Sequence, residues 1–165
     1  MVGKTNIFVN QLLTLRIMSL HFYSYARKGY EFIDEVSKEL KTTDTDKAGR
    51  MTKCVFRALR NRLTLDESLM FLAHLPMALK SVFVDGWKSG TKTGKLINMD
   101  DFVNEVVKED DNSAWRDFSD KKAVHETITT VFRVLTKNIT SGEIEKIMTV
   151  LPSDLQTILA VESSS

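Results

Sequence analysis

Residues 55–83 read VFRALRNRLTLDESLMFLAHLPMALKSVF, and residues 131–159 read VFRVLTKNITSGEIEKIMTVLPSDLQTIL. Aligned without a gap, at an offset of 76, the two segments are identical at 9 of 29 positions. Ordinary residue frequencies would give about two identities. Both prolines of the chain, Pro76 and Pro152, fall at equivalent positions. The sequence therefore predicts an internal repeat, with one copy in each half of the chain.

A shorter match upstream sets the limits of the two copies. Residues 31–36 (EFIDEV) resemble residues 101–106 (DFVNEV) at an offset of 70, so the second copy carries six extra residues in its first loop. Loops tolerate such insertions. We expect a flexible N-terminal extension over residues 1–21, a first repeat over 22–84, a connecting loop over 85–98, a second repeat over 99–160 and a flexible tail over 161–165.

Apolar residues in both copies recur at the spacing of helices. Phe32, Val36 and Leu40 lie four residues apart, on one helical face. Three further apolar faces are expected: Met51, Cys54, Val55, Ala58 and Leu59; Leu65, Leu69, Leu72 and Ala73; and Val124, Ile128, Val131, Val134 and Leu135. No convincing alternation of a strand is present. The predicted fold class is all-α: a bundle of about seven helices, in which the two repeats form one domain around a pseudo-two-fold axis.

Capping and turn residues mark where these helices begin. Thr64 and Glu67 have the spacing of a capping box, and Thr140 and Glu143 repeat it. Pro76 and Pro152 can only open a new helix, because proline lacks the backbone N–H that a helix interior needs. In the connecting loop, Trp87 is expected to anchor the chain to the helices, because an indole is rarely left in water.

Composition excludes several classes of protein. Hydrophobic residues make up 42% of the chain and charged residues 27%, and the formal net charge is +1, from 23 Lys and Arg against 22 Asp and Glu. These values are typical of a globular domain and exclude a disordered or a strongly cationic chain. The single cysteine, Cys54, allows no intramolecular disulfide.

The N-terminal residues resemble a signal peptide only superficially. Residues 7–20 are fairly apolar, but polar side chains interrupt them and no small-residue cleavage site follows. The run is also too short and too polar to cross a bilayer. We therefore expect a cytoplasmic protein that does not enter a membrane, and Met18 is a candidate for the true start of translation.

The caps and turns resemble a known family. The resemblance rests on five segments: residues 62–69 (RLTLDESL), 75–76 (LP), 85–87 (DGW), 139–144 (ITSGEI) and 151–155 (LPSDL). Over about residues 22–160 the chain resembles the bacterial family catalogued as domain of unknown function 2267. One departure is His74, where the family often has glutamine. The resemblance implies a bacterial, soluble, all-helical protein and carries over no catalytic or ligand residue.

The sequence contains no complete catalytic or metal-binding motif. His125 and Glu126 begin an H-E-x-x-H pattern, but Thr129 stands where the second histidine is needed. Cys54 lies on the apolar stripe of its helix, which indicates a buried, inert thiol. Glycine-rich phosphate-binding and nucleophile-elbow motifs are absent. We therefore expect no catalytic residue, metal or cofactor.

Charge is distributed unevenly along the chain. Residues 47–65 contain six basic residues and no acid, and Arg50, Lys53, Arg57 and Arg60 are spaced to form one stripe. Residues 100–120 contain eight acids against two bases. Either the stripe contacts phosphate or nucleic acid, or the acidic half neutralises it within the fold or across a dimer. The second is favoured, because Arg50, Lys53 and Arg60 correspond to Glu126, Thr129 and Thr136 in the second copy.

The function that these observations favour is that of a binding or scaffolding module for a protein partner or a second copy of itself. The alternative is a nucleic-acid-binding accessory protein that uses Arg50, Lys53, Arg57 and Arg60. An enzyme of unknown class is the least favoured, because no pair of nucleophile and base is visible.

Overall fold

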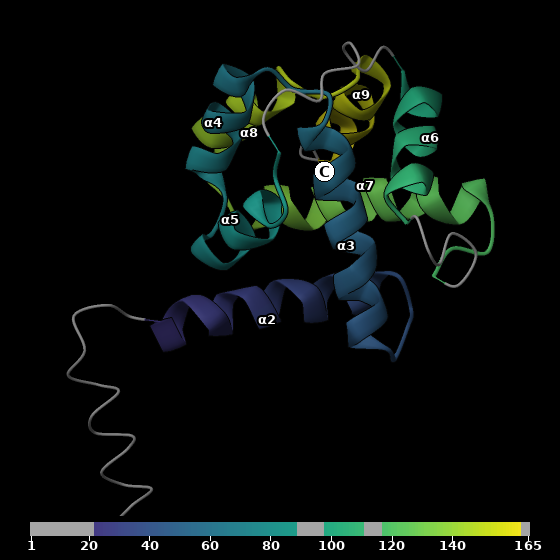
Figure 1. Cartoon of the computed structure of the whole chain (residues 1–165), viewed down its shortest axis with the longest axis horizontal. Coiled ribbons are helices and arrows are strands. Elements are labelled where there is room, and N and C mark those ends of the chain that lie inside the picture. The colour runs from purple at the N-terminus through teal and green to yellow at the C-terminus, as the bar shows by residue number, and fades with distance from the viewer. Residues whose placement is uncertain (1–21, 89–97, 111–116, 163–165) are drawn as a thin grey trace, which may run out of the picture.

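The structure is a computed structural model that describes residues 22–88, 98–110 and 117–162, and in these ranges every regular element is an α-helix (Figure 1). The first half contains α2 (Phe22–Glu39), α3 (Thr45–Arg60), α4 (Leu65–His74) and α5 (Met77–Val84). The second half contains α6 (Met99–Glu109), α7 (Lys121–Lys137), α8 (Ser141–Met148) and α9 (Ser153–Glu162). The all-α prediction is confirmed, with eight helices in the described residues where about seven were predicted.

The helices begin and end close to the expected divisions of the chain. α2 begins at Phe22, α5 ends at Val84 and α6 begins at Met99, while α9 continues to Glu162. Each half thus contributes four helices in the same order. The predicted extension over residues 1–21 and the end of the predicted tail, residues 163–165, lie outside the described residues. The common ancestry of the halves and the pseudo-two-fold axis stay predictions.

The core lies between α3 and α7, which cross near the centre of the molecule (Figure 1). The stripes expected on these two helices are buried over their whole length. Phenylalanine rings join the halves: Phe71 of α4 contacts Phe132 of α7 with ring centroids 6.4 Å apart, and Phe132 contacts Phe102 of α6 at 6.1 Å. The apolar faces of the two halves therefore cover each other.

The predicted apolar face of α4 is wrong except at Leu72, which packs against the core. Leu65 and Leu69 are 57% and 51% exposed, whereas Ser68 and Phe71 are buried. α4 has only ten residues, so either of two faces could carry the contact. The face that bears Phe71 is buried because a phenyl ring joining the aromatic cluster removes more apolar surface from water than a leucine does.

The predicted caps and turns begin the helices as expected. Thr64 Oγ1 accepts from the Glu67 N–H at 3.1 Å, and Glu67 Oε2 accepts from the Thr64 N–H at 2.7 Å. At Thr140, both the N–H and the hydroxyl donate to Glu143 Oε2, at 2.9 and 2.7 Å. Pro76 immediately precedes α5, and Pro152 immediately precedes α9.

Gly29 sets how closely α2 approaches α5. A Cβ atom at Gly29 would lie 2.7 Å from Ala78 Cβ, whereas one at Gly49 of α3 would meet its nearest atom, Ile33 Cγ2, at 3.9 Å. Both glycines lie inside helices, where alanine is intrinsically favoured by about 1 kcal/mol. The difference in stability between the two alanine variants therefore measures the cost of the clash between Gly29→Ala and Ala78 alone.

We expect Gly29→Ala to be less stable than Gly49→Ala by about 1–3 kcal/mol, which is the usual effect of overpacking. The measurement is urea unfolding of both variants followed by circular dichroism. Adding Ala78→Gly to Gly29→Ala removes the clash, so the double variant should lose less stability than the sum of the losses in the two single variants. Equal stability of the two alanine variants would show that α2 and α5 are not in such close contact.

Candidate binding site between α2 and α3

The predicted basic stripe begins with Arg50, which is paired across the two halves of the protein. Its Nε and Nη2 donate to the two carboxylate oxygens of Asp117, both at 2.7 Å. The Asp117 side chain is 3% exposed and the Arg50 side chain 42%. A bidentate pair of this geometry holds the guanidinium in one orientation. The acidic segment of the second half therefore neutralises this residue within the fold.

Lys53 and Arg57 share one carboxylate, which comes from the end of their own half. Asp85 Oδ2 lies 2.7 Å from Lys53 Nζ and 3.1 Å from Arg57 Nη2. The hydrogen bond from Lys53, with the charges of both cations, holds the pKa of Asp85 below its ordinary value. Asp85 directly follows α5, so these contacts fasten the start of the connecting segment to α3.

Arg60 does not belong to an exposed stripe. It is 6% exposed, and its Nη1 donates to the carbonyl oxygens of Phe83 at 2.6 Å and Asp85 at 3.0 Å. Carbonyl groups at a helix end lack partners inside the helix, and a guanidinium can supply them. The expectation that Arg60 faces outward with the other three residues is wrong, because this side chain closes the C-terminal end of α5.

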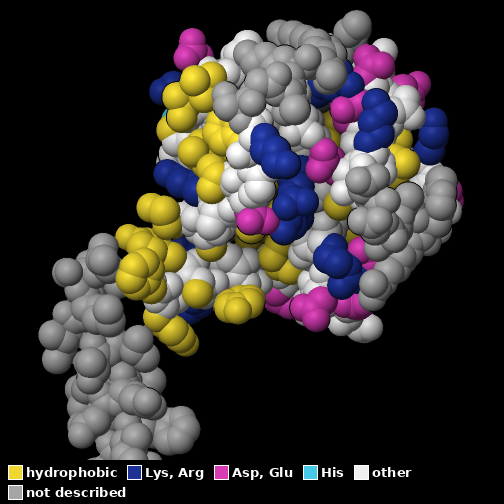
Figure 2. Space-filling model, in the orientation of Figure 1, with side chains coloured by type: hydrophobic (Ala, Val, Ile, Leu, Met, Phe, Trp, Pro, Cys, Tyr) yellow, Lys and Arg dark blue, Asp and Glu magenta, His cyan; other side chains and the backbone are white. Residues whose placement is uncertain are grey.

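The molecular surface over α3 shows the result of these pairings. Basic and acidic side chains alternate there, and no continuous basic patch covers the face that Figure 2 displays. The described residues thus hold each of the four stripe side chains against an internal acceptor. A phosphate backbone would have to compete with these partners.

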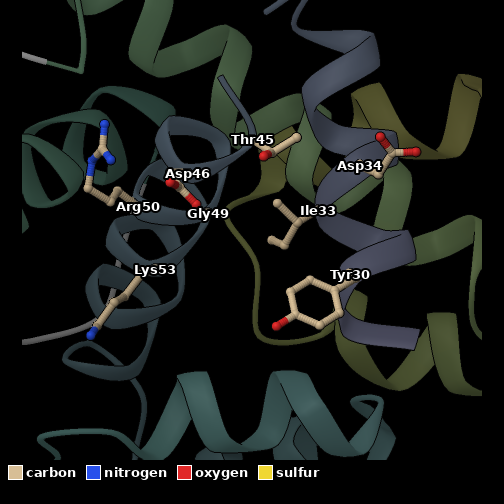
Figure 3. A pocket seen from close by; sticks show the side chains of 8 residues that line it. All are labelled: Tyr30, Ile33, Asp34, Thr45, Asp46, Gly49, Arg50 and Lys53. Carbon is tan, nitrogen blue, oxygen red and sulfur yellow. The ribbon is translucent and has the colours of Figure 1, made fainter. Parts of the chain in front are cut away.

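Beside the stripe, α2 and α3 enclose a pocket of about 640 Å³ (Figure 3). Its walls are Tyr30, Ile33 and Asp34 of α2 and Thr45, Asp46, Gly49, Arg50 and Lys53 of α3. Gly49 has no side chain to fill the gap. Figure 3 shows Tyr30 and Ile33 extending toward α3, whereas Arg50 and Lys53 extend away from α2. The interior is therefore mainly apolar.

Tyr30 is the feature of this pocket that the sequence did not indicate as functional. It is 77% exposed, an unusual degree for an aromatic side chain next to a buried stripe. The available signal was its position off the apolar face that Phe32 and Val36 define on the same helix. This position predicts that the Tyr30 ring is exposed. It does not predict the pocket beside the ring, because the pocket depends on how α2 packs on α3.

The charges at the pocket rim leave one carboxylate without a partner. Asp34 pairs with Lys38 at 2.6 Å, and Arg50 and Lys53 are held as described above. Asp46, which is exposed, has no hydrogen bond or ion pair with any other described residue. Its charge is partly balanced by the positive end of the α3 helix dipole and by Arg50 four residues further on.

The remaining predicted residues have structural positions. Trp87 packs edge-on against Phe83, with ring centroids 6.1 Å apart, which supports its role as an anchor. Burial, together with Asp110 and Glu109, raises the pKa of Cys54 to about 12, so the thiol is buried and protonated at neutral pH. In the described ranges, no cluster of three or more His, Cys, Asp or Glu side chains could hold a metal ion.

Comparisons with known proteins give one finding. Residues 29–158 match the family described as "Uncharacterized conserved protein (DUF2267)". A search of curated proteins finds no match to the chain. None of the helices described has the length and apolar character needed to cross a bilayer.

Proposed function

The chain belongs to the family of uncharacterized conserved proteins designated DUF2267, and we propose that it is a binding module that binds a partner protein in the pocket between α2 and α3. The observation that carries this proposal is the largely exposed Tyr30 ring beside an apolar hollow that Gly49 leaves open. The proposal includes no catalytic step and no cofactor. A cytoplasmic location is part of the proposal, and its support is that the single cysteine of the chain allows no intramolecular disulfide.

The chemistry of the pocket defines the partner. The apolar floor takes an aliphatic or aromatic side chain, and a wall of Tyr30 supplies contact area with little loss of side-chain entropy. Asp46 at the rim favours a neighbouring cation, because it is an exposed carboxylate that forms no direct ion pair with a described residue. We therefore propose that the partner is a peptide segment that presents an apolar side chain next to a lysine or arginine.

The test is selection of a displayed random-peptide library on the intact protein. We expect the enriched peptides to share an apolar residue adjacent to a basic one. Their affinity should fall at least tenfold on Tyr30→Ala, measured by fluorescence anisotropy. The matched control is Tyr23→Ala, because Tyr23 is 70% exposed on the same helix and does not line the pocket.

Two results would overturn the proposal. One is enriched peptides that bind Tyr30→Ala as tightly as the wild type. The other is the absence of enriched peptides together with retention of duplex or single-stranded nucleic acid that weakens with salt and is lost in Lys53→Gln. The second result would favour the nucleic-acid alternative, whose support is that the side chains of Arg50, Lys53 and Arg57 remain 42%, 41% and 28% exposed.

A further inference from the structure

The exposed apolar side chains of the protein are concentrated on its first half. Among the described residues, every large hydrophobic side chain that is exposed lies on α2, α4 or α5: Phe22, Tyr23, Tyr30, Leu65, Leu69, Met77 and Val84. In Figure 2, hydrophobic side chains gather at the upper left, over α4 and α5. Single apolar residues on a surface are ordinary, whereas a group of them marks an interaction site.

On α4 the exposed apolar residues lie along one side of the helix. Leu65, Leu69 and Ala73 are spaced four residues apart and extend over about 12 Å, at 1.5 Å per residue. Leu65 and Leu69 are 57% and 51% exposed, and Met77 at the start of α5 is 49% exposed. We call Leu65, Leu69 and Ala73 the leucine face of α4. None of its residues lines the pocket between α2 and α3.

The second half of the chain shows that the fold does not require this apolar face. At the offset of 76, the aligned positions are all polar: Leu65, Leu69, Ala73 and Met77 correspond to Ser141, Glu145, Thr149 and Ser153. The aligned helix α8 begins with the same capping box and forms without apolar residues at these positions. The exposed leucines of α4 therefore serve a contact outside the folded chain.

The charges at the two ends of the leucine face are opposite in sign. Asp66 lies in the first turn of α4 and is exposed. At the other end, Lys80 Nζ donates to the carbonyl oxygen of Ala73 at 3.3 Å. Asp66 and Ala73 are seven residues apart, so they lie on the same side of α4. The leucine face is therefore complementary in charge to a copy of itself that runs in the opposite direction.

We infer that the leucine face of α4 binds the same face of a second copy of this chain, with the two helices antiparallel. Leu69 meets Leu69 of the second copy at the two-fold axis, Leu65 meets Ala73, and Asp66 lies beside Lys80. Self-complementarity of this kind is what a two-fold symmetric dimer requires. Two ten-residue helices bury less area than the roughly 1,200 Å² of a stable complex, so the dimer is weak. The inference does not depend on the peptide-binding proposal, because the two surfaces share no residue.

The experiment is sedimentation equilibrium of the full chain from micromolar to millimolar concentration, where we expect a monomer–dimer equilibrium. Leu69→Glu introduces the residue type that the second half has at Glu145, and should weaken the association at least tenfold. Its urea midpoint should stay close to that of the wild type, because Leu69 is exposed. The matched control is Tyr23→Glu, which adds the same charge at a 70% exposed residue of α2 and should associate like the wild type.

Exchange of the two end charges tests the antiparallel arrangement. Asp66→Lys should weaken the dimer about fivefold, because like charges replace two exposed ion pairs. Adding Lys80→Glu to Asp66→Lys should restore most of the association, since the pairs form again with their charges reversed. The inference is overturned if the chain stays monomeric at millimolar concentration, which would leave the leucine face to a different protein. It is also overturned if Leu69→Glu associates as tightly as Tyr23→Glu, or if the double variant associates no better than Asp66→Lys.

Discussion

Replacing Phe132 with alanine is expected to lower the free energy of unfolding by about 3–5 kcal/mol, the range for large-to-small substitutions of buried aromatic residues. Phe132 is fully buried, and its ring contacts Phe71 of the first half and Phe102 of the second. The cavity left by the substitution would lie between the two halves, where neither backbone can collapse into it without moving the other.

Urea unfolding monitored by circular dichroism measures this loss. The matched control is Phe22→Ala, because Phe22 is 60% exposed at the start of α2, and its replacement should change stability by no more than about 0.5 kcal/mol. A loss below about 1 kcal/mol in Phe132→Ala would mean that the halves do not share a core at this ring.

The second large effect is expected at Glu105 of α6, which is 8% exposed and forms an ion pair with Arg62 of the first half. Removing one member of a buried pair leaves the other charge without compensation, at a cost of several kcal/mol. We expect Glu105→Gln to lower the free energy of unfolding by about 3 kcal/mol at pH 7, since glutamine keeps the volume and loses the charge. Glu31→Gln, which breaks an exposed pair with Arg27, should change little.

The loss in Glu105→Gln should depend on pH in a defined direction. Burial alone would raise the pKa of Glu105, but the hydrogen bonds from Arg62 and Lys108 outweigh it and lower the pKa below the ordinary 4.5. A carboxyl group with a lowered pKa in the folded state stabilises the protein fully above its unfolded pKa. That contribution disappears as the pH falls through the folded pKa.

The difference in stability between the wild type and Glu105→Gln should therefore be constant near neutral pH and shrink below about pH 4.5. Urea midpoints measured for both proteins from pH 7 to pH 3 give this difference directly. A difference that grows on acidification would show that the wild-type carboxyl is protonated on folding, contrary to the pairing with Arg62.

Apolar residues that recur every three or four positions, together with capping residues, were sufficient to locate most of the helices. The stripes of α3 and α7 are long enough, at 16 and 17 residues, for the apolar spacing to define one face, and that face is buried. In α4, with ten residues, leucines on one side and Phe71 on the other gave two candidate faces, and the leucine side was the wrong choice. Short helices carry too few turns for periodicity alone to identify the buried side.

The candidate sites were less predictable than the helices. The spacing of Arg50, Lys53, Arg57 and Arg60 correctly placed them on α3, but not their acceptors, which lie at Asp117, Asp85 and the end of α5. Those acceptors are 23 to 67 residues away along the chain. No local pattern encodes a contact at that separation, because it depends on how helices pack.

The sequence by itself determined that the chain is helical, where most helices begin, and which faces of its long helices avoid water. These properties follow from hydrogen bonds and apolar spacing within a few residues of one another. Only the tertiary structure decided that Arg60 closes a helix end and that Tyr30 lies beside an open pocket. Pockets and ion pairs of this kind arise where separate helices meet, and the distance between two helices is set by all the side chains packed between them.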